Sequence, residues 1–336
     1  MRAVVVAPGP DFSVQDVYRG WCTGLREIGV DVVEFNLNDR LGFFTEIQLE
    51  RGGELRRAFD LPGAVEATFE GLQSVLYRAW PDFIVCVSGF FTDGRLLDDI
   101  RRTRPHKLVM IHTESPYEDD RQVSLSEHFD VNIVNDPQNL DRYPNGTLYV
   151  PHAYDPKVHH PDGRGDEWDF SFVGTGYPSR IDYLESVDFG DARVGIGGNW
   201  PNLSDDSPLR PHLLNEPGEC IDNTETAEIY RSSTMSANLY RVEAERPELS
   251  TGWAMGPREV ELAACGTFFA RDPRGEGDEV FPMLPKVTDP RELSQIIAWS
   301  MSHPDERQAA ADLARAAISD RTFESNARRL MAALGA

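Results

Sequence analysis

The chain has 336 residues, and its 40% apolar content, with 17 Phe, 10 Tyr and 6 Trp, can fill the cores of two domains and excludes a disordered chain. The formal net charge of −23 disfavours broad binding to nucleic acid or anionic membranes, although a local basic pocket could still hold a nucleotide. No apolar run reaches about 18 residues, so no membrane span is predicted, and residues 1–8 are too short a stretch for a signal peptide. Four scattered cysteines without metal-ligand spacing favour reduced thiols and a cytoplasmic protein.

The first half of the chain alternates predicted strands and helices, an order that is typical of a parallel sheet. A helix is predicted over residues 14–28, where Gly29 ends it, and residues 37–75 are charged and helical in character. Residues 1–160 are therefore predicted to form one doubly wound domain. Its strands are expected at residues 3–7, 30–35, 81–88, 107–112, 129–135 and 148–152.

A second alternating series follows a predicted linker at residues 160–166, which is rich in turn-forming residues. Residues 161–320 are expected to form a second doubly wound domain, and residues 321–336 a C-terminal helix that could pack back toward the N-terminal domain. Two open α/β domains in tandem leave a cleft, a common place for small-molecule sites. Strands are expected at 169–173, 193–197, 235–239 and 267–270, and helices at 224–230 (capped by Asn223 or Thr224), 290–301, 304–318 and 322–334.

Residues 256–270, with the sequence GPREVELAACGTFFA, predict a short helix followed by a buried strand. Pro257 suits a first helical position, and Gly266 suits the left-handed residue that follows a helix. Because Gly256 opens the helix, free amides and the positive end of the helix dipole could hold a phosphate there.

Arg258 and Glu261 lie three residues apart and therefore share one face of this helix. Glu261 could accept two hydrogen bonds from a ribose diol, and Arg258 could add positive charge for a diphosphate. The alternative interpretation is an ordinary amphipathic helix whose arginine and glutamate pair with each other in solvent.

A glycine-rich turn opens the second domain, where a predicted strand runs into Gly174 and Gly176. Glycines at such a turn allow the backbone to approach a phosphate closely. Arg180 could reach the same phosphate, because its guanidinium is always charged. An ordinary turn followed by a surface arginine is the alternative.

Two further polar residues follow predicted strands of the second domain. Arg241 could point into the cleft, or could instead form a salt bridge with Glu243 or Glu245. Asp272 could bind sugar hydroxyls, or could cap the loop in which it lies.

The string from Arg258 to Thr267, Arg-x-x-Glu-Leu-Ala-Ala-Cys-Gly-Thr, resembles the donor-site signature of GT-B glycosyltransferases, and it is closest to their spore-maturation, CgeB-like branch. Residues 172–180 resemble the start of the second domain in that branch, and residues 238–241 resemble the strand end that precedes its donor helix. The resemblance implies an α/β chain with the GT-B fold, in which two Rossmann-like doubly wound domains face a cleft and a helical C-terminal tail follows.

The same resemblance implies how a donor would be bound. In those enzymes the glutamate that matches Glu261 holds the ribose of a nucleotide-sugar, and a UDP-sugar is the default donor. Many relatives also carry an upstream glutamate that contacts the sugar, and Trp253 occupies that position here.

Candidates for a catalytic base come from the end of the predicted strand at 107–112. An inverting transferase needs a group that takes the proton of the acceptor hydroxyl, and His112 and Glu114 are the available side chains. Relatives often have an acid before Ser-Pro at this point, and Glu114 precedes Ser115-Pro116. A loop glutamate that binds neighbouring amides is the alternative.

We therefore predict a metal-independent glycosyltransferase that moves a sugar from a nucleoside diphosphate sugar to an acceptor hydroxyl, with helix-end amides and arginines stabilising the diphosphate. No Asp-x-Asp or Walker motif occurs, and the adjacent His159 and His160 are not expected to share a metal ion. No cofactor is expected besides the donor. The acceptor could be a protein, a glycan or a small molecule, whereas the acidic surface disfavours modified DNA. The alternatives are a nucleotide-sugar epimerase and a non-catalytic nucleotide-binding or assembly protein.

Overall fold

A computed structural model describes residues 1–8, 14–51, 53–90, 92, 94–103, 106–163 and 165–335, and divides the chain into two compact units. Unit 1 comprises Met1–Val150 with Phe323–Ala336, and unit 2 comprises Pro151–Thr322. The division precedes the linker predicted at 160–166, because the residues just after Val150 already bond within unit 2. The amide of Tyr154 donates to the carbonyl of Arg321 at 3.0 Å, and Arg231 donates to the carbonyl of Val158 at 3.0 Å.

Unit 1 contains a six-stranded sheet in the order β2-β1-β5-β6-β7-β8, and every neighbouring pair is parallel. All five residues of the central strand β5 are buried, which explains its uninterrupted apolar sequence. The strands are β1 (Arg2–Val6), β2 (Asp31–Phe35), β5 (Phe83–Val87), β6 (Lys107–His112), β7 (Val131–Val134) and β8 (Leu148–Tyr149), and the helices between them are α1 (Gln15–Glu27), α2 (Leu37–Glu46), α3 (Leu61–Ala79), α4 (Gly94–Thr103) and α5 (Asp119–Ser126).

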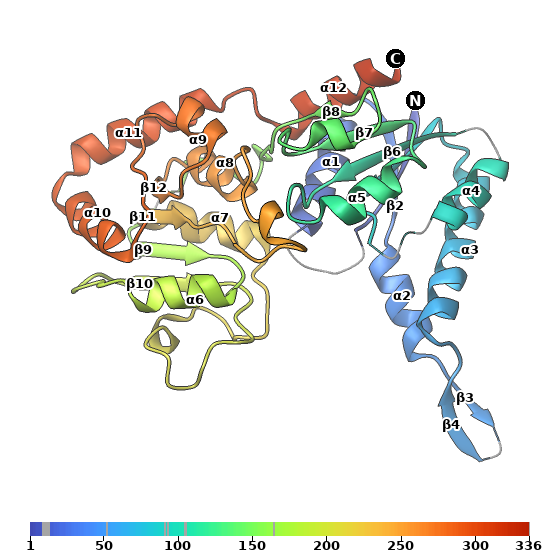
Figure 1. Ribbon diagram of the computed structural model, residues 1–336, viewed down its shortest axis with the longest axis horizontal. Helices are drawn as coiled ribbons and strands as arrows, with labels where there is room; N and C mark the ends of the chain where they lie inside the picture. The colour runs from blue at the N-terminus through green and yellow to red at the C-terminus, as the bar shows by residue number, and fades with distance from the viewer. Residues whose placement is uncertain are drawn as a thin grey trace. The chain divides into compact units, whose positions relative to one another are not determined.

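The region predicted as helical at 37–75 contains an antiparallel hairpin between α2 and α3. Its strands are β3 (Gln48–Arg51) and β4 (Glu54–Arg57), with Glu50 opposite Leu55. Gly53 adopts a positive φ of 82° in the turn, a conformation that glycine accepts without strain. The hairpin extends away from the sheet of unit 1 (Figure 1).

The C-terminal helix α12 (Phe323–Leu334) belongs to unit 1 and packs against α1 (Figure 1). The ring of Phe323 lies 6.5 Å from that of Trp21 in an edge-to-face arrangement. A Cβ atom at Gly20 would lie 2.1 Å from the Phe323 ring, and one at Gly24 would lie 2.3 Å from the Phe323 carbonyl oxygen. The two glycines therefore allow α12 to approach α1 closely.

Unit 2 contains a four-stranded parallel sheet in the order β10-β9-β11-β12, whose core includes Phe170, Phe172 and Phe269. In α7 the capping residue is Asp222, not Asn223 or Thr224, because its carboxylate accepts a hydrogen bond from the Thr224 amide. The strands are β9 (Trp168–Val173), β10 (Val194–Gly197), β11 (Ser233–Asn238) and β12 (Phe268–Arg271), and the helices are α6 (Pro178–Glu185), α7 (Asn223–Arg231), α8 (Pro257–Ala264), α9 (Gly275–Val280), α10 (Pro290–Ser302) and α11 (Pro304–Ala317).

The predicted α/β architecture with two Rossmann-like parallel sheets and a helical C-terminal region is therefore confirmed. In the part of the chain that the structure describes, no helix is both long and apolar enough to cross a membrane.

Candidate functional site

Arg258 of α8 lies at the carboxyl edge of the unit 2 sheet, the edge where open α/β sheets bind ligands. Its Nε atom donates to the carbonyl of Val173 at 2.7 Å, and one terminal nitrogen donates to Oδ1 of Asn238 at 2.8 Å. The guanidinium carbon also lies 4.9 Å from the centre of the Phe172 ring. These contacts hold a positive charge at the ends of β9 and β11.

The two glycines of the predicted phosphate-binding turn make room for neighbouring side chains. A Cβ atom at Gly174 would lie 2.2 Å from a terminal nitrogen of Arg258, and one at Gly176 would lie 2.3 Å from the ring of Trp200. Both positions therefore exclude a side chain for packing reasons alone. Their contact with a phosphate stays a prediction.

Arg180 of α6 is buried, with only 8% of its surface exposed. Its Nε atom donates to the carbonyl of Leu239 at 2.9 Å, and a terminal nitrogen donates to the carbonyl of Thr175 at 3.0 Å. Arg180 thus ties the turn after β9 to the segment after β11, and it brings a second guanidinium to the same sheet edge.

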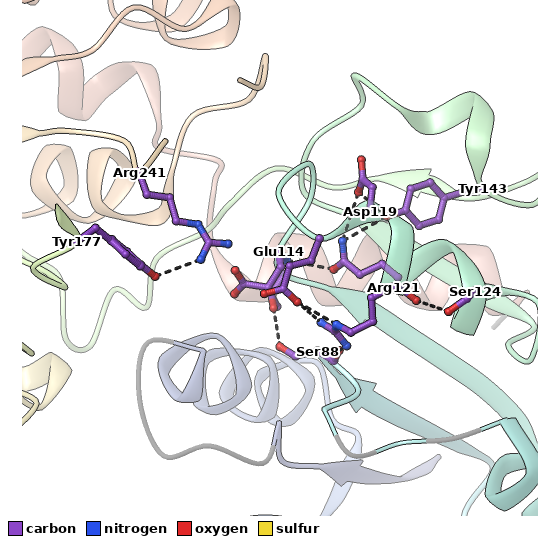
Figure 2. Close-up of polar contacts among 11 residues, drawn as sticks. Ser88, Glu114, Asp119, Arg121, Ser124, Tyr143, Tyr177 and Arg241 are labelled. Atoms are coloured by element: carbon purple, nitrogen blue, oxygen red, sulfur yellow. Dashed lines mark hydrogen bonds and ion pairs between the residues drawn. The ribbon is translucent and has the colours of Figure 1, made fainter. Parts of the chain in front are cut away.

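Arg241 follows β11 and donates to the phenol oxygen of Tyr177 at 3.1 Å (Figure 2). Glu243, one of its predicted partners, accepts hydrogen bonds from the amide and the hydroxyl of Ser179 at 3.2 Å, at the start of α6. Burial opposes ionisation of Glu243, but these bonds and those from the amides of Glu243 and Val242 outweigh it and lower its pKa. An internal carboxylate therefore already lies at the first turn of α6.

Asp272 joins the ends of β11 and β12. Its Oδ2 atom accepts from the amide of Tyr240 at 2.6 Å, and its own amide donates to the carbonyl of Asn238 at 3.0 Å. Burial raises the pKa of Asp272, although these bonds and nearby arginines oppose the shift. The structure thus shows the loop-capping arrangement, and a contact with sugar hydroxyls stays a prediction.

The start of α8 is occupied by a polar cluster around the buried Glu259, which no sequence pattern indicated. The Gly256 amide donates to Oε2 of Glu259 and to the phenol oxygen of Tyr240, both at 2.9 Å, and Tyr240 donates to Glu259. Arg274 lies over the Tyr240 ring at 4.1 Å. Burial raises the pKa of the Glu259 carboxyl to about 7. The predicted free amide at Gly256 is therefore not free, because Glu259 and Tyr240 already accept its hydrogen bond.

Glu261 lies on the other side of α8, and 15% of its side chain is exposed. Burial raises its pKa to about 7, while Arg258 and Asn223 act in the opposite direction. Oε1 of Glu261 lies 4.0 Å from Nε2 of His159, whose side chain is 2% exposed. Nothing local in the sequence indicates that His159 lies beside α8, and its adjacency to His160 suggested only the question of a metal ion.

The two candidate bases follow β6 in unit 1. His112 is 1% exposed and its Nε2 atom lies 3.0 Å from Oδ1 of Asn132; burial lowers its pKa to about 4. A ring enclosed in this way cannot reach an acceptor, which argues against His112 as the base. Glu114 is partly exposed, and its amide donates to Oε1 of Gln122 at 3.1 Å (Figure 2).

Polar groups surround the strand ends beside Glu114. Ser88, which follows β5, has a positive φ of 61°, and its hydroxyl bonds to that of Thr113. Arg121 of α5 donates to the carbonyl of Ser88 at 3.2 Å and pairs with Glu118 at 2.8 Å (Figure 2). A positive φ is energetically costly for serine, so the hydrogen bonds of Ser88 with Thr113 and Arg121 must stabilise this turn.

No three His, Cys, Asp or Glu side chains of the described residues are grouped so that they could hold a metal ion.

A family model described as glycosyl transferase-like matches residues 164–332. Solved structures match nearly the whole chain. They include sucrose-phosphate synthase from Thermosynechococcus elongatus (TM-score 0.65, 12% identity, 99% of this chain and 98% of that chain) and HepE from Anabaena in complex with UDP-glucose (0.63, 12%, 99% and 99%). A putative UDP-N-acetylglucosamine 2-epimerase from Listeria monocytogenes also matches (0.62, 11%, 99% and 95%). At these identities the likeness shows the fold, which is GT-B. A comparison with curated protein sequences finds no significant match.

Proposed function

The chain belongs to the glycosyl transferase-like family, whose model covers half of its length, and we propose that unit 2 binds the nucleoside diphosphate of a UDP-sugar. The reaction class is transfer of a sugar from a nucleotide-sugar, and the family match makes epimerisation a weaker fit. UDP as the nucleotide is supported by the UDP-glucose bound to HepE, a protein of the same fold. We also propose that the chain belongs to the CgeB-like branch, because residues 258–267 resemble the signature of that branch. We further propose that the protein is cytoplasmic and that its reaction needs no metal ion.

The observation that carries the proposal is the position of Glu261 and Arg258 on α8, where the arginine is close enough to act on the pKa of the glutamate. A carboxylate that is mostly buried is costly unless hydrogen bonds satisfy it, and the two hydroxyls of a ribose can each donate one. Arg258 is already fixed by Val173 and Asn238, so its charge needs no rearrangement when a diphosphate forms. Arg241 and the buried Arg180 would add positive charge at the same edge.

In the proposed reaction an acceptor hydroxyl oxygen bonds to the anomeric carbon of the sugar, and the bond from that carbon to the diphosphate oxygen breaks. UDP leaves with the electron pair, and a base takes the proton of the acceptor. For an inverting reaction we assign that base to Glu114, because it is partly exposed whereas His112 is enclosed.

The test is thermal unfolding with UDP, GDP, ADP and UDP-sugars, using the wild type, Glu261→Ala and the matched control Glu225→Ala. Glu225 is an exposed glutamate in α7. At about 100 times its Kd, UDP should add about 2.7 kcal/mol of stability to the wild type and to Glu225→Ala, and none to Glu261→Ala. If no nucleotide stabilises the wild type, the proposed donor site is wrong. Binding without sugar release would favour the non-catalytic alternative, and conversion of a UDP-sugar without an acceptor would favour the epimerase.

A further inference from the structure

His159 is a buried imidazole without a hydrogen-bond partner. Its side chain is 2% exposed, and neither ring nitrogen has a partner in good hydrogen-bonding geometry among the described residues, although the Asn223 side chain is close enough to act on its pKa. Its backbone is fixed, because the His159 amide donates to the carbonyl of Asp155 at 2.8 Å and Arg231 donates to the carbonyl of the preceding Val158. An unsatisfied polar group in the interior is destabilising, and proteins keep few of them. A hydrogen-bond partner in the ligand-bound state would explain why the protein has a buried imidazole at position 159.

Glu261 is the candidate partner that also belongs to the proposed donor site. Its Oε1 atom lies 4.0 Å from Nε2 of His159, which is too far for a hydrogen bond but close enough that a small rotation of the carboxylate would form one. The side-chain amide of Asn223, at the start of α7, lies beside both groups, where it acts to raise the pKa of His159 and to lower the pKa of Glu261. The other titratable or charged groups facing the pair are Arg258, Tyr230 and Cys265 around Glu261, and Asp155 and Arg231 around His159.

We propose that His159 is a positioning residue of the donor site, which donates from Nε2 to Oε1 of Glu261 when a ligand binds and leaves Oε2 to accept from the vicinal diol of a nucleoside. This inference rests on the proposed function, because it assigns the ligand of Glu261. It adds to that function a second residue, far from the α8 motif in sequence, on which recognition of the diol depends.

The protonation states of the pair fit this role. Burial lowers the pKa of His159 to about 4, so near neutral pH the imidazole is uncharged and carries one N–H. Burial raises the pKa of Glu261 to about 7, and a diol needs the ionised form as its acceptor. A hydrogen bond from His159 favours that ionised form. The affinity for a diol should therefore fall as the pH drops below about 7, and loss of His159 should move this fall to higher pH.

The experiment measures the Kd of UDP and of 2′,3′-dideoxy-UDP from pH 6 to pH 8.5 by calorimetry. The two probes share the diphosphate, so their difference reports the diol alone. His159→Phe should weaken UDP binding about tenfold at pH 7 and raise the pH midpoint by about one unit, with little change for the dideoxy probe. His159→Gln, which retains an N–H donor, should bind UDP nearly as the wild type does.

Three outcomes would overturn the inference. If His159→Phe keeps the wild-type midpoint and UDP affinity while Glu261→Ala loses binding, the donor site stands and the role of His159 is wrong. If the wild type does not bind UDP, both proposals fail. Should His159→Phe not fold, the ¹⁵N resonances of the wild-type imidazole decide: addition of UDP should shift a protonated Nε2, and an unchanged spectrum contradicts the proposal.

Discussion

Helix α8 carries two glutamates whose surroundings differ. Glu259 faces the start of the helix, is fully buried, and accepts hydrogen bonds from Gly256 and Tyr240. Glu261 faces His159 and Asn223 and is partly open to solvent. Burial raises the pKa of both carboxyls to about 7, so the pKa alone does not distinguish them. Their partners distinguish them: the hydrogen bonds of Glu259 lie within the fold, whereas Glu261 is the carboxylate for which we propose a ligand.

The largest expected effect is that of Glu259→Ala. This substitution leaves the Gly256 amide and the Tyr240 hydroxyl with one acceptor fewer, and it removes the carboxylate that faces the buried charge of Arg271. The free energy of unfolding should fall by about 3 kcal/mol, measured as the denaturation midpoint of the full chain. If Glu259→Ala is as stable as the wild type, the structural assignment of Glu259 is wrong.

Glu261→Gln should have the opposite effect on stability. The folded pKa of Glu261, about 7, lies above its ordinary value of 4.5, so its ionisation destabilises the fold progressively between pH 4.5 and 7. Glu261→Gln should therefore be more stable than the wild type, by up to about 3 kcal/mol above pH 7, with the gain disappearing below pH 4.5. UDP affinity should nevertheless fall. Unfolding of both proteins at pH 4.5 and pH 8 measures the difference, and a gain that is the same at both would contradict the assigned pKa.

Gly174→Ala tests whether the position of Arg258 matters for the proposed donor site. The added methyl would lie 2.2 Å from a terminal nitrogen of Arg258, so the guanidinium must move away from Val173 and Asn238. We expect a loss of about 1–2 kcal/mol in stability and weaker UDP binding, read from thermal unfolding with and without UDP. Gly218→Ala is the control, since a methyl there contacts nothing within 4 Å.

Tyr240→Phe should produce the smallest change. It removes the hydrogen bond that Tyr240 donates to Glu259 and the one that it accepts from the Gly256 amide, while the bond from the Gly256 amide to Glu259 remains. The expected loss is about 1 kcal/mol of unfolding free energy, with UDP affinity unchanged. A large loss of UDP affinity in this variant would show that the two faces of α8 are not separate.

The sequence predicted the elements whose limits are set by burial and by backbone preference. Strand β5 is apolar at every position because it is buried on both faces, and α8 begins at Pro257 and ends before Gly266, whose φ is 71°. The β3–β4 hairpin was not predictable in the same way. Its side chains in β4 are all exposed, so no alternation of apolar and polar residues distinguishes it from the charged helices beside it.

The candidate site was predictable only where its residues lie close together in sequence. Arg258 and Glu261 are neighbours on one helix, and their spacing indicated a shared face. His159 meets Glu261 across about a hundred residues, and Gly174 is a glycine because Arg258 occupies the space beside it. Such contacts depend on how the strands are ordered in the sheet, which local patterns do not specify.

The packing of α12 on α1 also bears on how the protein is made. Phe323 lies against Gly20 and Trp21 of the first helix, and everything in unit 2 is translated between these two partners. On the ribosome, the rest of unit 1 emerges before unit 2, with the face of α1 beside Gly20 and Gly24 uncovered. Unit 2 can fold before α12 covers that face. The unit that is synthesised first is therefore completed last.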